Sequence, residues 1–174
     1  MSSGTILFLL LRPLHVLLAA LWIGSAFFTS CLLMPAVNDV GPAGGQVMVA
    51  LNRKGLVTFF AVIGGLTVVT GVYLYWRFTG GFDPEVSRSH AGLAFGVGGI
   101  AGLVALIIGG AVVGRSSKQV VDIMGQVARM PDGAEKTARL QTAGALRQKM
   151  SSAGRIVVAL QVIALVLMAV AHYI

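Results

Sequence analysis

The chain contains three histidines, His15, His90 and His172, and each falls at the end of a different apolar segment. Imidazole nitrogens are frequent ligands of transition metals and of haem iron. The charges of the connecting loops, described below, place these three ends on the same side of a membrane. Three imidazoles at one depth therefore predict a metal or haem site.

Each histidine also has a purely structural interpretation. His15 follows Arg12-Pro13, where an interfacial ring would hydrogen-bond headgroups or water. His90 follows the serines that can cap its helix, a position compatible with full exposure. His172 lies close to the carboxyl end, which is compatible with a solvated terminus. The shared side and depth of the three rings favour a common site over these separate interpretations.

Two further side chains lie on the same helical faces as the histidines. Trp22 falls on the side of His15, and Met168 lies one helical turn before His172. Imidazoles from two helices can ligate haem iron axially, so His15, His90 and His172 are candidate haem b ligands with Trp22 beside them. Imidazole combined with the Met168 thioether instead suits copper. Cys31 and Met34 add soft donors near the opposite end of the first apolar segment, although such residues usually serve packing.

The composition is that of a membrane protein. Apolar residues make up 56% of the chain and charged residues 11%, and 13 Lys and Arg face 6 Asp and Glu. Four stretches without a charged residue, 14–37, 56–76, 91–113 and 156–174, approach or exceed the about 20 residues that cross a bilayer. Since lipid cannot satisfy backbone polar groups, each stretch must be helical. We expect an all-α bundle of four transmembrane helices at about 6–37, 56–77, 90–114 and 153–174, forming one domain over residues 1–174.

The distribution of Lys and Arg predicts the orientation. Ten of them lie in the first and third connections: Arg53, Lys54, Arg115, Lys118, Arg129, Lys136, Arg139, Arg147, Lys149 and Arg155. The opposite side has three, Arg12, Arg77 and Arg88. Because positive loops remain cytoplasmic, we expect a protein of the bacterial inner membrane with both termini on the periplasmic side. The apolar run that follows the amino terminus continues past any small-residue cleavage site, so we expect it to be retained as the first helix.

The connection 115–152 is long enough for two helices. Ser116 or Ser117 offers a cap for the first, and Pro131-Asp132-Gly133 forms a turn before the second. An apolar stripe opposite the basic residues predicts a cytoplasmic helical hairpin that lies against anionic headgroups or merely connects the spans. In the first connection, Pro35 is expected to break the first helix before a short helix around 46–52.

The glycines of residues 92–110 have small-xxx-small spacing, as in Gly92/Gly96 and Gly98/Gly102. Such spacing lets helix backbones pack closely, and it also leaves room for a flat macrocycle. No carboxylate lies within a span, and no phosphate-binding loop or nucleophile with a base at motif spacing is present, which argues against hydrolases, phosphotransferases and ion channels. The single cysteine, Cys31, excludes an intramolecular disulfide.

Residues 12–24 (RPLHVLLAALWIG) are similar to the first helix of the copper-resistance protein D (CopD) superfamily. Residues 70–73 (TGVY), preceded by Arg53-Lys54, match the pattern of the second helix in that superfamily. Its members include periplasm-facing copper-uptake proteins and, more distantly, the small haem-b-containing protoporphyrinogen oxidases of the HemJ type. The resemblance covers the first two helices and implies that the metal-side role falls to His15.

These observations predict an integral membrane protein with a histidine site on the periplasmic side. The leading hypothesis is haem b bound by His15 with either His90 or His172, for electron transfer with a quinone or a periplasmic redox protein. Copper binding or transport through His15, His90, His172 and Met168 is the alternative, and a cofactor-free accessory subunit is the third. The partner in every case is the lipid bilayer, not nucleic acid; an oligomer or a larger membrane complex stays open.

Overall fold

A computed structural model describes residues 3–174, and this part of the chain is 88% helical without strands. The helices are α1 (Ser3–Phe28), the π-helical turn η1 (Thr29–Leu33), α2 (Met34–Asp39), α3 (Pro42–Arg53), α4 (Leu56–Phe78), α5 (Pro84–Arg88), α6 (His90–Ile108), the π-helical turn η2 (Gly109–Gly114), α7 (Arg115–Val127) and α8 (Ala134–Val170).

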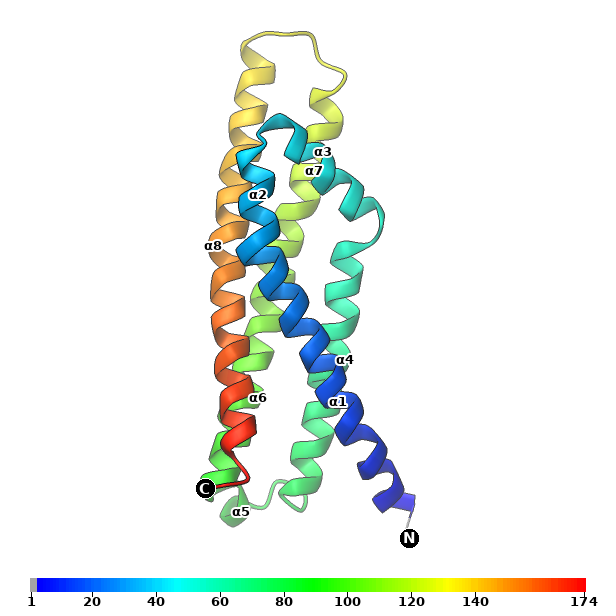
Figure 1. Ribbon diagram of the computed structural model, residues 1–174, viewed down its shortest axis with the longest axis vertical. Coiled ribbons are helices and arrows are strands. Elements are labelled where there is room, and N and C mark those ends of the chain that lie inside the picture. Colours follow the sequence, from blue (N-terminus) through cyan, green and yellow to red (C-terminus); the bar gives the residue numbers. More distant parts are fainter. Residues whose placement is uncertain (1–2) are drawn as a thin grey trace.

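Four continuous helical stretches are long and apolar enough to cross a membrane: Gly4–Asp39, Leu56–Phe78, His90–Val127 and Ala134–Val170. They run side by side along the long axis of the molecule, and both chain ends lie at the same end of the bundle (Figure 1). The prediction of an all-α bundle of four membrane-spanning helices is confirmed. We call the end that carries the chain termini the histidine end, and the opposite end the basic end.

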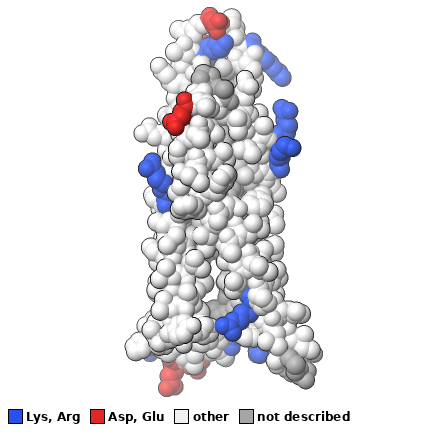
Figure 2. Space-filling model, in the orientation of Figure 1, with Lys and Arg blue, Asp and Glu red and all other residues white. Residues whose placement is uncertain are grey.

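Charged side chains lie towards the two ends of the bundle. On the face shown in Figure 2, a band between these groups carries no Lys, Arg, Asp or Glu. In α4 the uncharged stretch 56–76 corresponds to about 30 Å of helix at the usual rise per residue, which is the thickness of a hydrocarbon core. The large apolar side chains exposed around this band, among them Leu17, Val69 and Ile100, are therefore suited to contact lipid.

The helix that contains the third span does not end near residue 114. The α6 helix passes through the turn η2 directly into α7, so that one helical stretch extends from His90 to Val127. The two serines expected to cap a new helix are buried inside this stretch, and Ser117 Oγ donates to Asn52 Oδ1 at 3.0 Å. The capping prediction was wrong because Gly114 keeps right-handed helical dihedral angles and no proline interrupts the sequence there.

The α8 helix is also continuous, from Ala134 to Val170, where two helices with a break near residue 152 were expected. Helix α7 and the first half of α8 run beside each other as a helical hairpin and prolong the bundle at its basic end (Figure 1). Their apolar residues face each other: Val120, Val127, Ala143 and Met150 are buried. The apolar stripe therefore serves helix packing.

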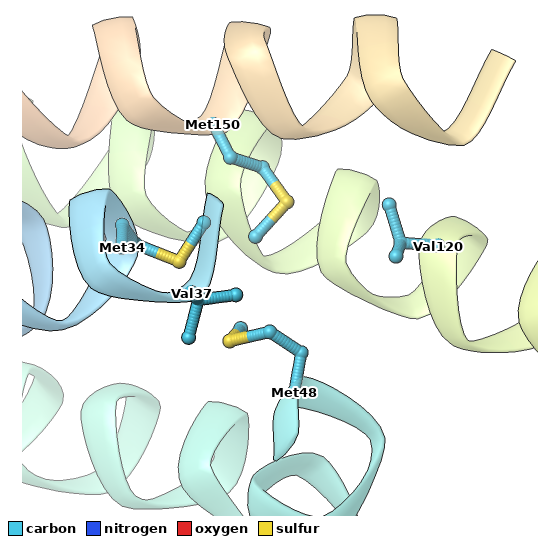
Figure 3. Packing of buried hydrophobic residues seen from close by; sticks show 5 residues of the cluster. All are labelled: Met34, Val37, Met48, Val120 and Met150. Carbon is cyan, nitrogen blue, oxygen red and sulfur yellow. The ribbon is translucent and has the colours of Figure 1, made fainter. Parts of the chain in front are cut away.

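A methionine-rich core closes the basic end. Met34 and Val37 on α2, Met48 on α3, Val120 on α7 and Met150 on α8 form one buried cluster. Their side chains extend into the same interior space from four helices (Figure 3). Flexible thioether side chains fill the irregular space where short and long helices meet.

The first span passes through Pro35 instead of ending there. Pro35 has no backbone N–H to donate to the preceding turn, and the turn η1 directly before it is π-helical, with Met34 N bonded to Thr29 O. The chain changes direction at Gly41, whose φ of 62° suits glycine. The short helix expected around 46–52 is present as α3, which begins at Pro42.

Candidate functional site

His15 is held against α4 near the histidine end. Its Nδ1 lies 3.0 Å from the carbonyl oxygen of Thr67 and 3.0 Å from Thr70 Oγ1. The ring is half-buried between α1 and α4, where these two helices pack on each other.

The hydrogen-bond partners determine which ring nitrogen of His15 carries a proton. A carbonyl oxygen can only accept, so Nδ1 must be protonated and must donate to Thr67. Thr70 Oγ1 already donates to the carbonyl oxygens of Leu66 and Thr67, and it therefore acts as a second acceptor for the same proton. In the neutral ring, Nε2 then carries the lone pair. This is the arrangement in which histidine binds a metal, with the other ring nitrogen donating to a backbone carbonyl.

Gly71 provides the surface on which the imidazole rests. A Cβ atom added at this position would lie 2.9 Å from His15 Cε1, closer than real Cβ contacts allow. Thr70 and Gly71 belong to the segment 70–73, and His15 belongs to the segment 12–24. The two sequence segments on which the family resemblance was based therefore contact each other in space.

His172 has a different partner. Its Nε2 lies 2.8 Å from Arg12 Nη2, so the end of the chain is joined to α1. Arginine can only donate, and Nε2 must therefore be the unprotonated nitrogen, with the proton on Nδ1. The ring also packs edge-on against Phe95 of α6, with ring centroids 5.3 Å apart. To ligate through Nε2, His172 would first have to lose Arg12.

His90 is exposed at the start of α6. With Leu93, Ala94 and Val97 of α6 and Leu167 and Ile174 at the end of the chain, it lines an open apolar groove of about 530 Å³. Ser89 caps this helix, as expected, by accepting from Gly92 N at 3.1 Å. An exposed imidazole in an apolar groove is available to a ligand without rearrangement of the protein.

Trp22 and Met168, the two side chains grouped with the histidines from sequence, occupy packing positions. Trp22 is buried in a cluster with Ile63, Ala105 and Val157. Its ring lies so close to α4 that a Cβ at Gly64 would be 2.9 Å from Trp22 Cε2. Met168 lies against Gly98 of α6. Trp22 therefore belongs to the hydrophobic core of the bundle, and Met168 packs α8 against α6.

The structure gives each histidine its own contacts. Within residues 3–174, no group of three or more His, Cys, Asp or Glu side chains is arranged to hold a metal ion. Sequence reasoning did not identify Arg12 as the partner of His172, or Thr67 and Thr70 as the partners of His15. A helical wheel shows which residues share a face of one helix but not which helices are neighbours, so the sequence carried no signal for these contacts.

Comparison of the chain with protein-family models, with curated proteins and with solved structures gave no match.

Proposed function

We propose that this protein is a b-type haem protein of the bacterial inner membrane that transfers electrons near the periplasmic face, with His15 as the first haem ligand. The observation that carries the proposal is the hydrogen bond that His15 Nδ1 donates to the Thr67 carbonyl oxygen. This bond leaves Nε2 unprotonated, with its lone pair available to bind iron. Haem would supply a one-electron redox couple at this site.

The residues around His15 fit this role. Thr67 and Thr70 fix the ring orientation and the tautomer, and Gly71 gives the ring its place against α4. The second ligand is His90 or His172. His90 is exposed, whereas His172 would have to exchange its bond with Arg12 for a bond to iron. The ten Lys and Arg residues towards the basic end support a cytoplasmic location for that end, and hence a periplasmic location for the histidines.

The test is a reduced-minus-oxidised absorption spectrum of the full chain, produced with an adequate haem supply and purified in detergent. We expect a Soret band and its loss in His15→Ala. Loss in only one of His90→Ala and His172→Ala identifies the second ligand. A wild-type protein without a Soret band rejects the proposal.

The same preparation distinguishes the other two hypotheses. Stoichiometric copper by elemental analysis, lost on His15→Ala or Met168→Ala, would assign copper to the site. If neither haem nor copper is bound and replacement of all three histidines leaves assembly unchanged, the protein is an accessory subunit without a cofactor.

A further inference from the structure

An open groove of about 430 Å³ lies between the first span and α4, on the side of the basic end. This volume is in the usual range of small-molecule sites. The lining is apolar apart from the hydroxyl groups of Ser25 and Thr29. It includes Leu21, Gly24 and Leu33 of the first span, Leu51 of α3, and Leu56 and Phe60 of α4. The groove therefore suits a ligand that is largely hydrocarbon.

The groove exists because the first span moves from one neighbour to another. At Trp22 the first span rests on α4, where a Cβ at Gly64 would lie 2.9 Å from Trp22 Cε2. About two turns later it rests on α8, where a Cβ at Gly154 would lie 2.7 Å from Ser30 Oγ. The first span and α4 consequently diverge towards the basic end (Figure 1). Gly24 lines the space between them, and a Cβ added there would meet no atom within 4 Å.

The groove has the depth of one membrane leaflet. Leu56 is the first residue of the uncharged stretch of α4, so the groove opens where headgroups meet the hydrocarbon core. On the first span the lining extends from Ala20 to Leu33, which is about 20 Å of helix at the usual rise per residue. Half of a hydrocarbon core is about 15 Å thick. An acyl chain that enters beside Leu56 can therefore follow the groove over its length.

Two cations lie at the open end of the groove. Arg53 and Lys54 connect Leu51 to the start of α4, and Lys54 follows Leu51 by three residues, on the same side of the helix. Both side chains are exposed, and neither takes part in an ion pair within residues 3–174. Long basic side chains at this level can reach a lipid phosphate, and anionic headgroups attract them. An apolar groove below two cations is complementary to an anionic lipid.

We propose that this groove binds one acyl chain of an anionic phospholipid from the leaflet at the basic end, with the lipid phosphate beside Arg53 and Lys54. The hydroxyl groups of Ser25 and Thr29 can donate to the ester oxygens of such a lipid, which only accept. The proposal goes beyond the haem function, because His15 is not among the lining residues and the test does not require haem.

The test begins with the full-length protein in detergent, incubated with phosphatidylglycerol or with phosphatidylcholine that carries the same acyl chains. We expect native mass spectrometry to show one retained phosphatidylglycerol per chain. We also expect phosphatidylglycerol to raise the Tm more than phosphatidylcholine does, because a ligand of the folded state stabilises it. Equal retention and equal Tm increases for the two lipids would overturn the proposal.

The charges are tested by a double variant, Arg53→Gln with Lys54→Gln. We expect it to abolish the difference between the two lipids, because the cations that attract the phosphate are removed. The matched control, Arg129→Gln with Lys149→Gln, removes the same charge from exposed residues that do not line the groove. It should leave the difference in place. Equal losses in the two double variants would mean that net charge alone attracts the lipid, which overturns the proposal.

Gly24→Leu fills the groove without changing a charge, and we expect it to lose the retained phosphatidylglycerol. The matched control is Gly99→Leu on α6, which is also exposed and has no atom within 4 Å of an added Cβ. Retention in Gly24→Leu as in the wild type would overturn the proposal. If Gly24→Leu does not fold, the comparison of the two charge variants decides the case.

A second copy of the chain is the competing occupant. A dimer of the wild type that is lost in Gly24→Leu and does not depend on the charge of the lipid would assign the groove to that copy and overturn the proposal. Absence of haem from every preparation rejects only the proposed function, since lipid retention is measured without it.

Discussion

Arg12 and His172 lie 160 residues apart in the sequence, yet Arg12 Nη2 is 2.8 Å from His172 Nε2. This contact joins the first span to the end of the last one at the histidine end. It also assigns the proton of His172 to Nδ1, because the guanidinium can only donate. The nitrogen that would be the simplest metal ligand is therefore engaged by the protein itself.

A double-mutant cycle measures this contact. His172→Phe keeps a ring against Phe95 but removes the acceptor, and Arg12→Gln removes the charged donor. We expect a coupling free energy of about 0.5 to 1 kcal/mol, since the pair is exposed. Unfolding in detergent gives the four stabilities. The control cycle replaces His172→Phe with His90→Phe, and coupling of the same size there would contradict a specific bond.

Gly71→Ala tests whether the close approach of His15 to α4 matters. The added Cβ would lie 2.9 Å from His15 Cε1, so the ring must move and its bond to Thr67 must weaken. We expect a loss of about 1 to 3 kcal/mol in the free energy of unfolding, as for other overpacked sites, and a lower haem content.

The matched control for this substitution is Gly65→Ala on the same helix, where an added Cβ meets nothing within 4 Å. It is expected to be neutral or to stabilise the helix by up to about 1 kcal/mol. Equal effects of the two substitutions on stability and on the Soret absorbance would show that Gly71 has no special relation to His15.

The four spans could be predicted from the sequence because hydrocarbon thickness and backbone hydrogen bonding leave few choices for long uncharged stretches. The N-cap of α6 could also be predicted from the sequence, because Ser89 directly precedes the helix and its hydroxyl accepts from a residue only three positions later. Such features depend on neighbouring residues alone.

The continuity of α6 into α7 was not predictable in the same way. Ser116 and Ser117 are of a residue type that often caps helices. Helix α7 packs on α3, however, and Ser117 donates its hydrogen bond to Asn52, 65 residues earlier in the sequence. Tertiary contact here overrides local preference. The same holds for the site: the sequence identifies His15 as a candidate, but only the packing of α1 on α4 selects Thr67, Thr70 and Gly71 as its partners.

Met150 tests the role of the methionine-rich core in holding α8 to α2, α3 and α7. Met150→Ala leaves a cavity in a buried cluster, so we expect a loss of about 2 to 5 kcal/mol in the free energy of unfolding. Met150→Leu keeps the volume and should cost less than about 1.5 kcal/mol. Hydrogen exchange should become faster in α3 and α7 of the alanine variant. Unchanged exchange there would mean that these helices are held by other contacts.

Asp132, in the turn between α7 and α8, provides a test of pH dependence outside the spans. A hydrogen bond from Lys136 Nζ at 2.7 Å and the positive charge of that group hold the pKa of Asp132 below its usual value. Its stabilising contribution is therefore present above the pKa of the unfolded chain and is lost as the pH falls through the lower pKa of the folded state. Because both side chains reach solvent, the effect on stability should be small.

The more direct readout of this pair is the carboxyl ¹³C shift of Asp132 followed by NMR across an acid titration. Lys136→Gln should raise the pKa towards that of an unpaired aspartate, since the charge and the strongest donor are removed. Lys149→Gln, farther along α8, serves as the control and should leave the titration unchanged. Added salt should raise the pKa of Asp132 in the wild type more than in Lys136→Gln, because it screens the charge of an exposed lysine. A titration that is the same in Lys136→Gln and in the wild type would show that the ion pair does not persist in solution.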